Sequence, residues 1–172
     1  MIQLREAHTN DAAVIALLAR VTFTETFGHY FRNPTDLDQY LNQTFGVSKL
    51  RTSLSKPHNV FWLAYVDELP VGYAKLKRNS PSPFLNSDRV CQLQKIYVLK
   101  DFLSQKVGLA LQGILLKKAQ EEGFQKIWLS VLKANERAIR FYTKNGFDTF
   151  GDHGFSIGME DFEFQVMAKN LS

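Results

Sequence analysis

The spacing of apolar residues alternates between helical and strand periods along this chain, and the order of these segments limits the fold more than any other feature. Helical spacing occurs at about residues 9–28, 34–41, 47–55, 104–122 and 135–145. Strand-type runs occur at residues 2–6, 60–66, 71–77, 90–98, 127–131, 147–150 and 162–167. This order predicts one mixed α/β domain.

Capping residues and glycines mark the ends of the predicted helices. Thr9 or Asn10 is expected to cap the first helix, and Asn33 before a proline is expected to cap the second. Gly123 and Gly146 are expected to end the two later helices.

Length and composition narrow the class of protein. The 172 residues fit one domain, because domains contain roughly 100–200 residues. The 45% apolar and 22% charged residues are close to the soluble globular average. A single cysteine, Cys91, excludes an internal disulfide. The charged start, and the lack of an apolar run of about 18 residues, lead us to expect a soluble cytoplasmic protein with no membrane span.

The net charge of +4 hides an uneven distribution. Residues 95–144 hold ten Lys and Arg against four acids, which gives +6. Residues 145–172 hold five acids against one Lys, which gives −4. The basic segment suits an anionic ligand, and the acidic end suits a cationic one.

The chain from predicted strand 90–98 into predicted helix 104–122 carries a Q-x-x-G-x-A pattern, formed by Gln105, Lys106, Val107, Gly108, Leu109 and Ala110. Free amides at a helix N-terminus bind phosphate oxygens, and small residues let a ligand approach the backbone. A glycine packed at an ordinary helix start would give the same pattern. Neither a Rossmann fingerprint nor a P-loop is present.

About 25 residues further on, the chain reads N-x-x-A-x-x-F-Y-x-K-x-G-F from Asn135 to Phe147. On these two motifs, the protein is identified as a member of the GNAT N-acetyltransferases. Finer features are similar to the bacterial spermidine/spermine acetyltransferase branch: the segments 22–27 and 93–102, and His153, Phe155, Gly158 and Met167. The resemblance implies a GNAT-like fold over residues 1–172, with a mixed, mostly antiparallel, twisted sheet flanked by helices and with splayed central strands.

The resemblance also implies acetyl-CoA as cosubstrate. The backbone of Ile96, Tyr97 and Val98 would pair with its pantetheine arm, and the loop of residues 105–110 would hold its pyrophosphate. Asn135 matches a family residue that contacts the pantetheine region, although a plain helix cap would explain it equally well.

Tyr142 matches the family's general acid. A phenol with a pKa of about 10 is protonated at neutral pH and can donate to a departing thiolate. The alternative is an aromatic residue on the buried helix face. Many family members place a Glu base on the strand that here carries Gln92 and Gln94. Glu25, His153, Glu160 or a water chain could replace it, and each of the three side chains also has an ordinary surface or capping role.

The acidic end of the chain points to the acceptor. A polyamine or another small cationic amine would be held by Asp152, Glu160 and Asp161, together with Glu25 and His153, unless the segment is simply a solvated hairpin. A protein N-terminus or Lys side chain as acceptor, and a silent CoA-binding regulatory module, are the alternatives.

Other ligands and partners have less support. The basic residues surround the cosubstrate motifs, so we expect no nucleic acid partner. The histidines at positions 8, 29 and 58 lack ligand spacing, so we expect no metal. Cys91 is expected to be a buried strand residue rather than a nucleophile. Edge strands near the C-terminus would allow a homodimer.

Overall fold

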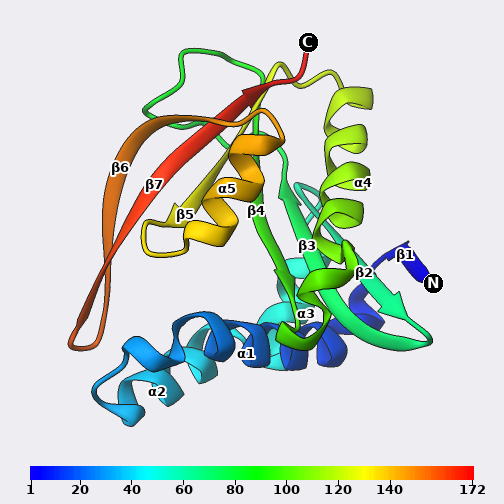
Figure 1. The fold of residues 1–172 in the computed structure, drawn as a ribbon. Helices are drawn as coiled ribbons and strands as arrows, with labels where there is room; N and C mark the ends of the chain where they lie inside the picture. Colours follow the sequence, from blue (N-terminus) through cyan, green and yellow to red (C-terminus); the bar gives the residue numbers. More distant parts are fainter.

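Seven strands form one sheet in the order β1-β2-β3-β4-β5-β7-β6 in the computed structural model, which describes residues 1–172 (Figure 1). The strands are β1 Ile2–Glu6, β2 Asn59–Val66, β3 Leu69–Lys77, β4 Val90–Val98, β5 Lys126–Leu132, β6 Asp148–Ile157 and β7 Glu160–Asn170. Every neighbouring pair is antiparallel except β4 and β5, which are parallel. The predicted mixed, mostly antiparallel sheet is therefore confirmed.

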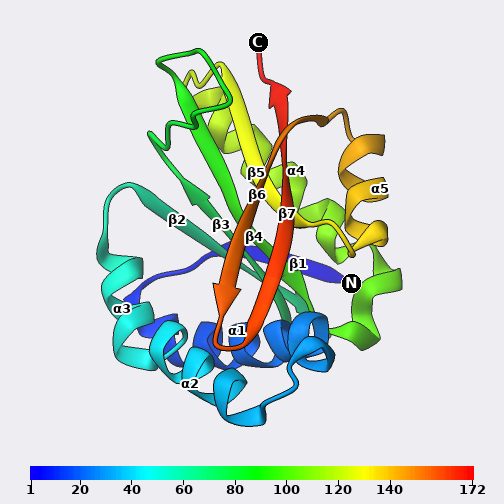
Figure 2. The ribbon, with the colours of Figure 1, turned by 90° about the vertical axis from the view of Figure 1, so that its left-hand side faces the viewer.

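Helices cover both faces of this sheet (Figures 1 and 2). Helices α1 Ala12–Phe27, α2 Pro34–Thr44 and α3 Val47–Ser55 lie on one face, and α4 Val107–Glu121 and α5 Glu136–Lys144 lie on the other. Strand β2 alternates between the two cores: Phe61 and Leu63 pack with α1, whereas Trp62 and Ala64 pack with α4. None of the helices is long and apolar enough to cross a bilayer.

The two parallel central strands separate soon after they meet. Only Val90–Gln92 of β4 pair with Lys126–Trp128 of β5. Beyond this point β4 stays paired with β3, and β5 stays paired with β7. Between them the sheet has an opening lined by unpaired backbone edges, which confirms the predicted splay.

The first helix starts differently from the prediction. Thr9–Asp11 form a 3-10 turn, and neither Thr9 nor Asn10 is the cap. Instead the Asp11 carboxylate accepts the His8 amide hydrogen at 2.8 Å and pairs with Arg5 of β1 at 2.7 Å. These two contacts tie the turn to the first strand, and the α-helix begins at Ala12.

The last two strands are longer than predicted, because β6 is an edge strand with almost no buried side chain. Only Ile157 of its ten residues is buried, so the strand shows no apolar alternation. The β6–β7 turn docks on the segment around α2: Arg32 bonds Glu160 at 2.9 Å, and Asp36 accepts the Met159 amide hydrogen at 2.9 Å. Gly158 adopts a φ of 56° there, where a Cβ would strike Asp36.

Candidate active site

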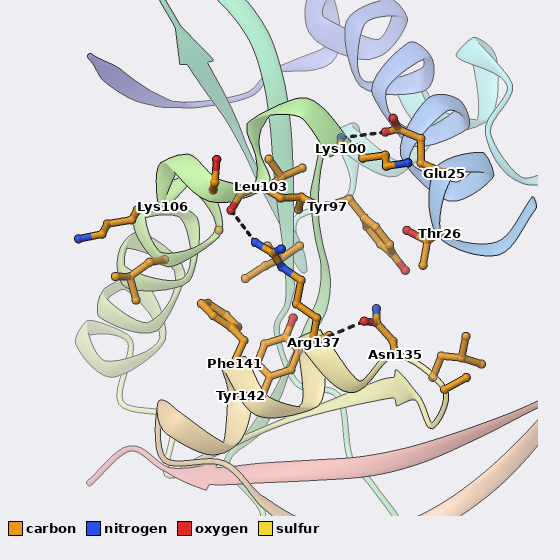
Figure 3. A pocket seen from close by; sticks show the side chains of 18 of the residues that line it. Glu25, Thr26, Tyr97, Lys100, Leu103, Lys106, Asn135, Arg137, Phe141 and Tyr142 are labelled. Carbon is orange, nitrogen blue, oxygen red and sulfur yellow. Dashed lines mark hydrogen bonds between the residues drawn. The ribbon is translucent and has the colours of Figure 1, made fainter.

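A cavity of about 740 Å³ opens where β4 and β5 diverge (Figure 3). We call it the larger cavity. Its walls come from the end of α1, the end of β4, the start of α4 and the inner face of α5. The residues that line it are Glu25, Thr26, His29, Tyr30, Ile96, Tyr97, Val98, Lys100, Leu103, Ser104, Lys106, Gly108, Leu109, Leu132, Ala134, Asn135, Arg137, Ala138, Phe141, Tyr142, Lys144 and Asn145.

The N-terminus of α4 supplies free amides to this cavity. The predicted helix 104–122 begins as a 3-10 helix over Lys100–Gln105, and Lys106 then turns the chain with a φ of 62°. The first α-helical bond runs from the Ala110 amide to the Lys106 carbonyl, at 3.1 Å, so the preceding amides of α4 have no acceptor in the helix. A Cβ added to Gly108 would meet nothing within 4 Å, which leaves these amides accessible to a ligand.

The charge of the larger cavity is positive. Lys100, Lys106, Arg137 and Lys144 line it, and Glu25 is the one carboxylate among the lining residues. Glu25 already accepts the Lys100 amide hydrogen at 3.1 Å. This arrangement favours a polyanionic ligand.

The inner edge of β4 faces the opening between the strands. Ile96, Tyr97 and Val98 pair with Ala74, Tyr73 and Gly72 of β3 on one side only. Their other backbone edge has no strand partner, so it can pair with amide groups of an extended ligand.

Asn135 caps α5. Its side-chain oxygen accepts the Ala138 amide hydrogen at 3.2 Å, and its side-chain amide makes no hydrogen bond within the protein (Figure 3). The cap predicted from sequence is confirmed, and the free NH₂ remains available at the cavity wall.

Tyr142 is buried at the junction of α5 and the opening, with 8% of its surface exposed. Its hydroxyl makes no hydrogen bond within the protein. Burial raises the pKa of this phenol well above its ordinary value, with a further contribution from Tyr97. The group is therefore protonated at neutral pH and free to donate.

A smaller cavity of about 60 Å³ continues through the opening to the α1 face of the sheet. It shares seven residues with the larger cavity: Thr26, Ile96, Tyr97, Leu132, Asn135, Ala138 and Tyr142. Its residues are Thr26, Phe27, Leu93, Gln94, Lys95, Ile96, Tyr97, Leu129, Ser130, Val131, Leu132, Asn135, Ala138, Tyr142 and Phe164. The side-chain oxygen of Gln94 is buried there without a donor. Tyr142 thus lies between two spaces that meet at the splayed strands.

His153 reaches the rim of the smaller cavity from β6. Its Nε2 lies 2.8 Å from the Ser130 hydroxyl, and its ring stacks on Phe164 with centroids 5.3 Å apart. The sequence predicts a role for His153, but its contact with Ser130 depends on strand pairing that the sequence does not show.

The acids predicted to hold a cationic acceptor already have partners. Glu160 accepts bonds from the backbone and side chain of Arg32, which lower the pKa of its carboxyl. Lys133 pairs with Asp152 at 3.2 Å, and Asp161 accepts the Ser156 hydroxyl.

Two lysines face the α1 side of the sheet instead. Lys75 and Lys95 are directly paired across β3 and β4. Burial, together with the neighbouring lysines, lowers the pKa of Lys75 to about 7, and burial lowers that of Lys95 to about 8.

The larger cavity contains nine of the residues predicted from sequence: Glu25, Ile96, Tyr97, Val98, Lys106, Gly108, Leu109, Asn135 and Tyr142. Five predicted residues do not line it: Gln105, Val107, Ala110, His153 and Glu160. Val107 is fully buried, so only its amide is of use to a ligand. Arg137 and Phe141 also line the larger cavity. Both lie inside the second motif, which is the signal that could have identified them from the sequence.

The site combines three features: splayed parallel strands, free helix amides at their opening and a buried phenol between two cavities. Together they define the class of acetyl-CoA-dependent N-acetyltransferases. The chain belongs to the acetyltransferase (GNAT) family, whose model matches residues 18–147. This family uses acetyl-CoA, and the protein is an acetyltransferase.

Relatives and solved structures agree with this assignment. The chain is 27% identical over 157 residues to an uncharacterized N-acetyltransferase of Lactobacillus delbrueckii subsp. lactis, covering 91% of this chain and 90% of the relative. It is 29% identical over 138 residues to an uncharacterized N-acetyltransferase of Mycobacterium tuberculosis, covering 80% and 84%. The PaiA N-acetyltransferase of Thermoplasma acidophilum, solved in complex with coenzyme A, has the same fold, with a TM-score of 0.77, 20% identity and 99% of both chains covered. The ribosomal-protein-S18-alanine N-acetyltransferase of Escherichia coli matches with a TM-score of 0.73 and 16% identity, covering 100% of this chain and 95% of that one.

Proposed function

We propose that this enzyme transfers the acetyl group of acetyl-CoA to a primary amine, with Tyr142 as the general acid. The observation that carries the proposal is the place of Tyr142, whose unpartnered phenol lies where the two cavities meet. A protonated group there can neutralise the thiolate that leaves when the amine attacks. A positioned acid of this kind typically accelerates a reaction by a factor of about 10²–10⁴.

The residues of the larger cavity fit acetyl-CoA. The free amides at Val107, Gly108 and Leu109 and the Lys106 side chain would hold the pyrophosphate, and the unpaired edge of β4 with Asn135 would hold the pantetheine arm. When bound, acetyl-CoA supplies an activated acyl group. The protein itself binds and orients the cosubstrate and protonates the leaving thiolate.

In this proposal the acceptor amine reaches the thioester through the smaller cavity, because the cosubstrate occupies the larger one. The sequence predicts a polyamine or another small cationic amine. Support for that choice is the excess of acids in β6 and β7, and a polyamine would have to displace the present partners of Glu160 and Asp152. A small amine without extra charges needs no such exchange.

A panel of amines tests the proposal. Release of free thiol from acetyl-CoA is followed with spermidine, spermine, glycine, a Lys-containing peptide and a peptide with a free N-terminal amine. Thiol release that depends on an amine, with acetylated product confirmed by mass, is the expected result. Coenzyme A binding without turnover of any of them would instead indicate a silent binding module.

A further inference from the structure

The attacking amine needs a proton acceptor, and the usual strand position offers none. At neutral pH an amine with a pKa of about 10 is mostly protonated, so a proton must leave before attack. Strand β4 carries Gln92 and Gln94, whose amides take up no proton.

The carboxylates considered from sequence are also committed elsewhere. Glu25 accepts the Lys100 amide hydrogen and lines only the larger cavity. Glu160 accepts one bond from the backbone and one from the side chain of Arg32, and these bonds keep the pKa of its carboxyl low. Of the titratable residues in the smaller cavity, Tyr97 has its pKa raised to about 12 by burial and keeps its proton. Lys95 also lines the smaller cavity, with its ammonium 5.3 Å from the ring centroid of Phe45 and 5.9 Å from that of Tyr97. It makes no hydrogen bond that could carry a proton onward.

One route for a proton leads out of the smaller cavity. Ser130 lines this cavity from β5, at the register where β5 pairs with Val166 of β7. His153 lies opposite Phe164 on the outer pair β6–β7 and reaches across that ring to the Ser130 hydroxyl, 2.8 Å away. Stacking on Phe164 fixes the orientation of the His153 imidazole. Because His153 lies on the exposed strand β6, the imidazole is also open to solvent.

We propose that Ser130 and His153 carry the proton of the acceptor amine from the smaller cavity to solvent. Ser130 is the residue that touches the amine, and His153 is a positioning and proton-accepting residue that acts through it. This inference rests on the proposed function.

The proton balance is complete without another reactant. The N–H bond of the acceptor ammonium breaks, its proton passes to the Ser130 oxygen, and the Ser130 hydroxyl proton passes to His153 Nε2. The imidazolium then releases that proton to solvent. The free amine forms the new C–N bond, the C–S bond breaks, and Tyr142 protonates the thiolate. The second proton lost by the nitrogen restores the Tyr142 phenol, so one proton is released per turnover.

Two substitutions test this route, and each preserves the local packing. His153→Phe keeps an aromatic ring on Phe164 but has no proton acceptor, and Ser130→Ala removes the relaying hydroxyl. The control is Thr149→Val, which removes the 3.3 Å bond from Gln165 between the same strands but lines neither cavity. The profile of kcat/KM is measured from about pH 5.5 to 10 with the most active amine of the panel, with thermal unfolding as a check on folding.

For the wild type, we expect kcat/KM to rise with pH, because the amine must lose a proton before it attacks. In each of the two variants, kcat/KM should be about 100-fold below the wild-type value at pH 7. This difference should shrink toward pH 10, where the amine is deprotonated without the help of a base. The KM for acetyl-CoA should be unchanged in both variants. The control variant should keep the kcat/KM of the wild type at every pH.

A loss that is equal at every pH would indicate a merely structural role and overturn the inference, as would a His153→Phe enzyme with the wild-type profile. Wild-type turnover is the separate test of the proposed function, so the two failures are distinguishable.

Discussion

The Arg137 guanidinium of α5 donates a hydrogen bond to the Leu103 carbonyl of the 3-10 segment before α4, at 3.0 Å (Figure 3). This bond joins the second motif to the segment just before the first motif, across the larger cavity. It holds the wall formed by residues 100–105 against α5 and keeps one positive charge at the cavity. We therefore expect Arg137 to shape the site for acetyl-CoA rather than to take part in the chemistry.

Arg137→Ala should weaken acetyl-CoA binding by about tenfold, because one hydrogen bond of a charged group is lost and the wall is released. Saturating kcat should change little. The matched control is Arg140→Ala one turn further on α5, whose exposed side chain makes only a 3.9 Å ion pair with Glu136. Calorimetric titration with coenzyme A measures the affinity of both variants. Equal losses of affinity in the two variants would refute a specific role for Arg137.

Gly108→Ala separates the binding role of the α4 N-terminus from its folding role. An added methyl group meets no protein atom within 4 Å, so the fold should be kept. The same methyl group would occupy the space where a phosphate approaches the amides, and affinity for coenzyme A should fall by tenfold or more, roughly the loss of one charge-assisted hydrogen bond.

Gly113→Ala is the control for that experiment, because Gly113 lies on the same helix with the same open surroundings but away from the cavity. It should raise stability by about 0.4–1 kcal/mol and leave affinity unchanged. Unaltered coenzyme A binding by Gly108→Ala would argue against the predicted phosphate contact.

The buried lysine pair predicts a pH dependence of stability. The pKa of Lys75 is lowered to about 7, below its ordinary value of 10.5, so the unfolded chain binds the proton more tightly. This lysine therefore costs stability below about pH 7, and the cost disappears as the pH rises toward 10.5. Lys75→Met should be more stable than the wild type at pH 7, by a margin that decreases with rising pH.

Urea unfolding of both proteins between about pH 6.5 and 10 measures that margin, with exposed Lys117→Met as the control for a change of charge. A constant difference across this range would contradict a depressed pKa for Lys75.

Much of the scaffold could be predicted from the sequence, because periodicity and capping residues act locally. Nearby residues account for strands β2 to β5, for the Asn33 and Asn135 caps, and for helix α4, which begins inside the Q-x-x-G-x-A motif. Long-range features could not be predicted in this way. The Ser130–His153 contact depends on the order β5-β7-β6, and the pairing of Glu160 with Arg32 depends on where the β6–β7 turn docks. The edge strand β6 lacks the buried alternation that marks a strand.

Tyr142→Phe is the sharpest test of Tyr142 as the general acid, because the substitution removes the hydroxyl and leaves the packing of the ring. The phenol oxygen makes no hydrogen bond within the protein, so stability should be unchanged or slightly higher. The measurement is kcat for the best panel amine at saturating acetyl-CoA, together with the Kd of coenzyme A. We expect kcat to fall by about 10²-fold or more while the Kd stays within about twofold. A variant that turns over at the wild-type rate would contradict the assignment of Tyr142 as the general acid.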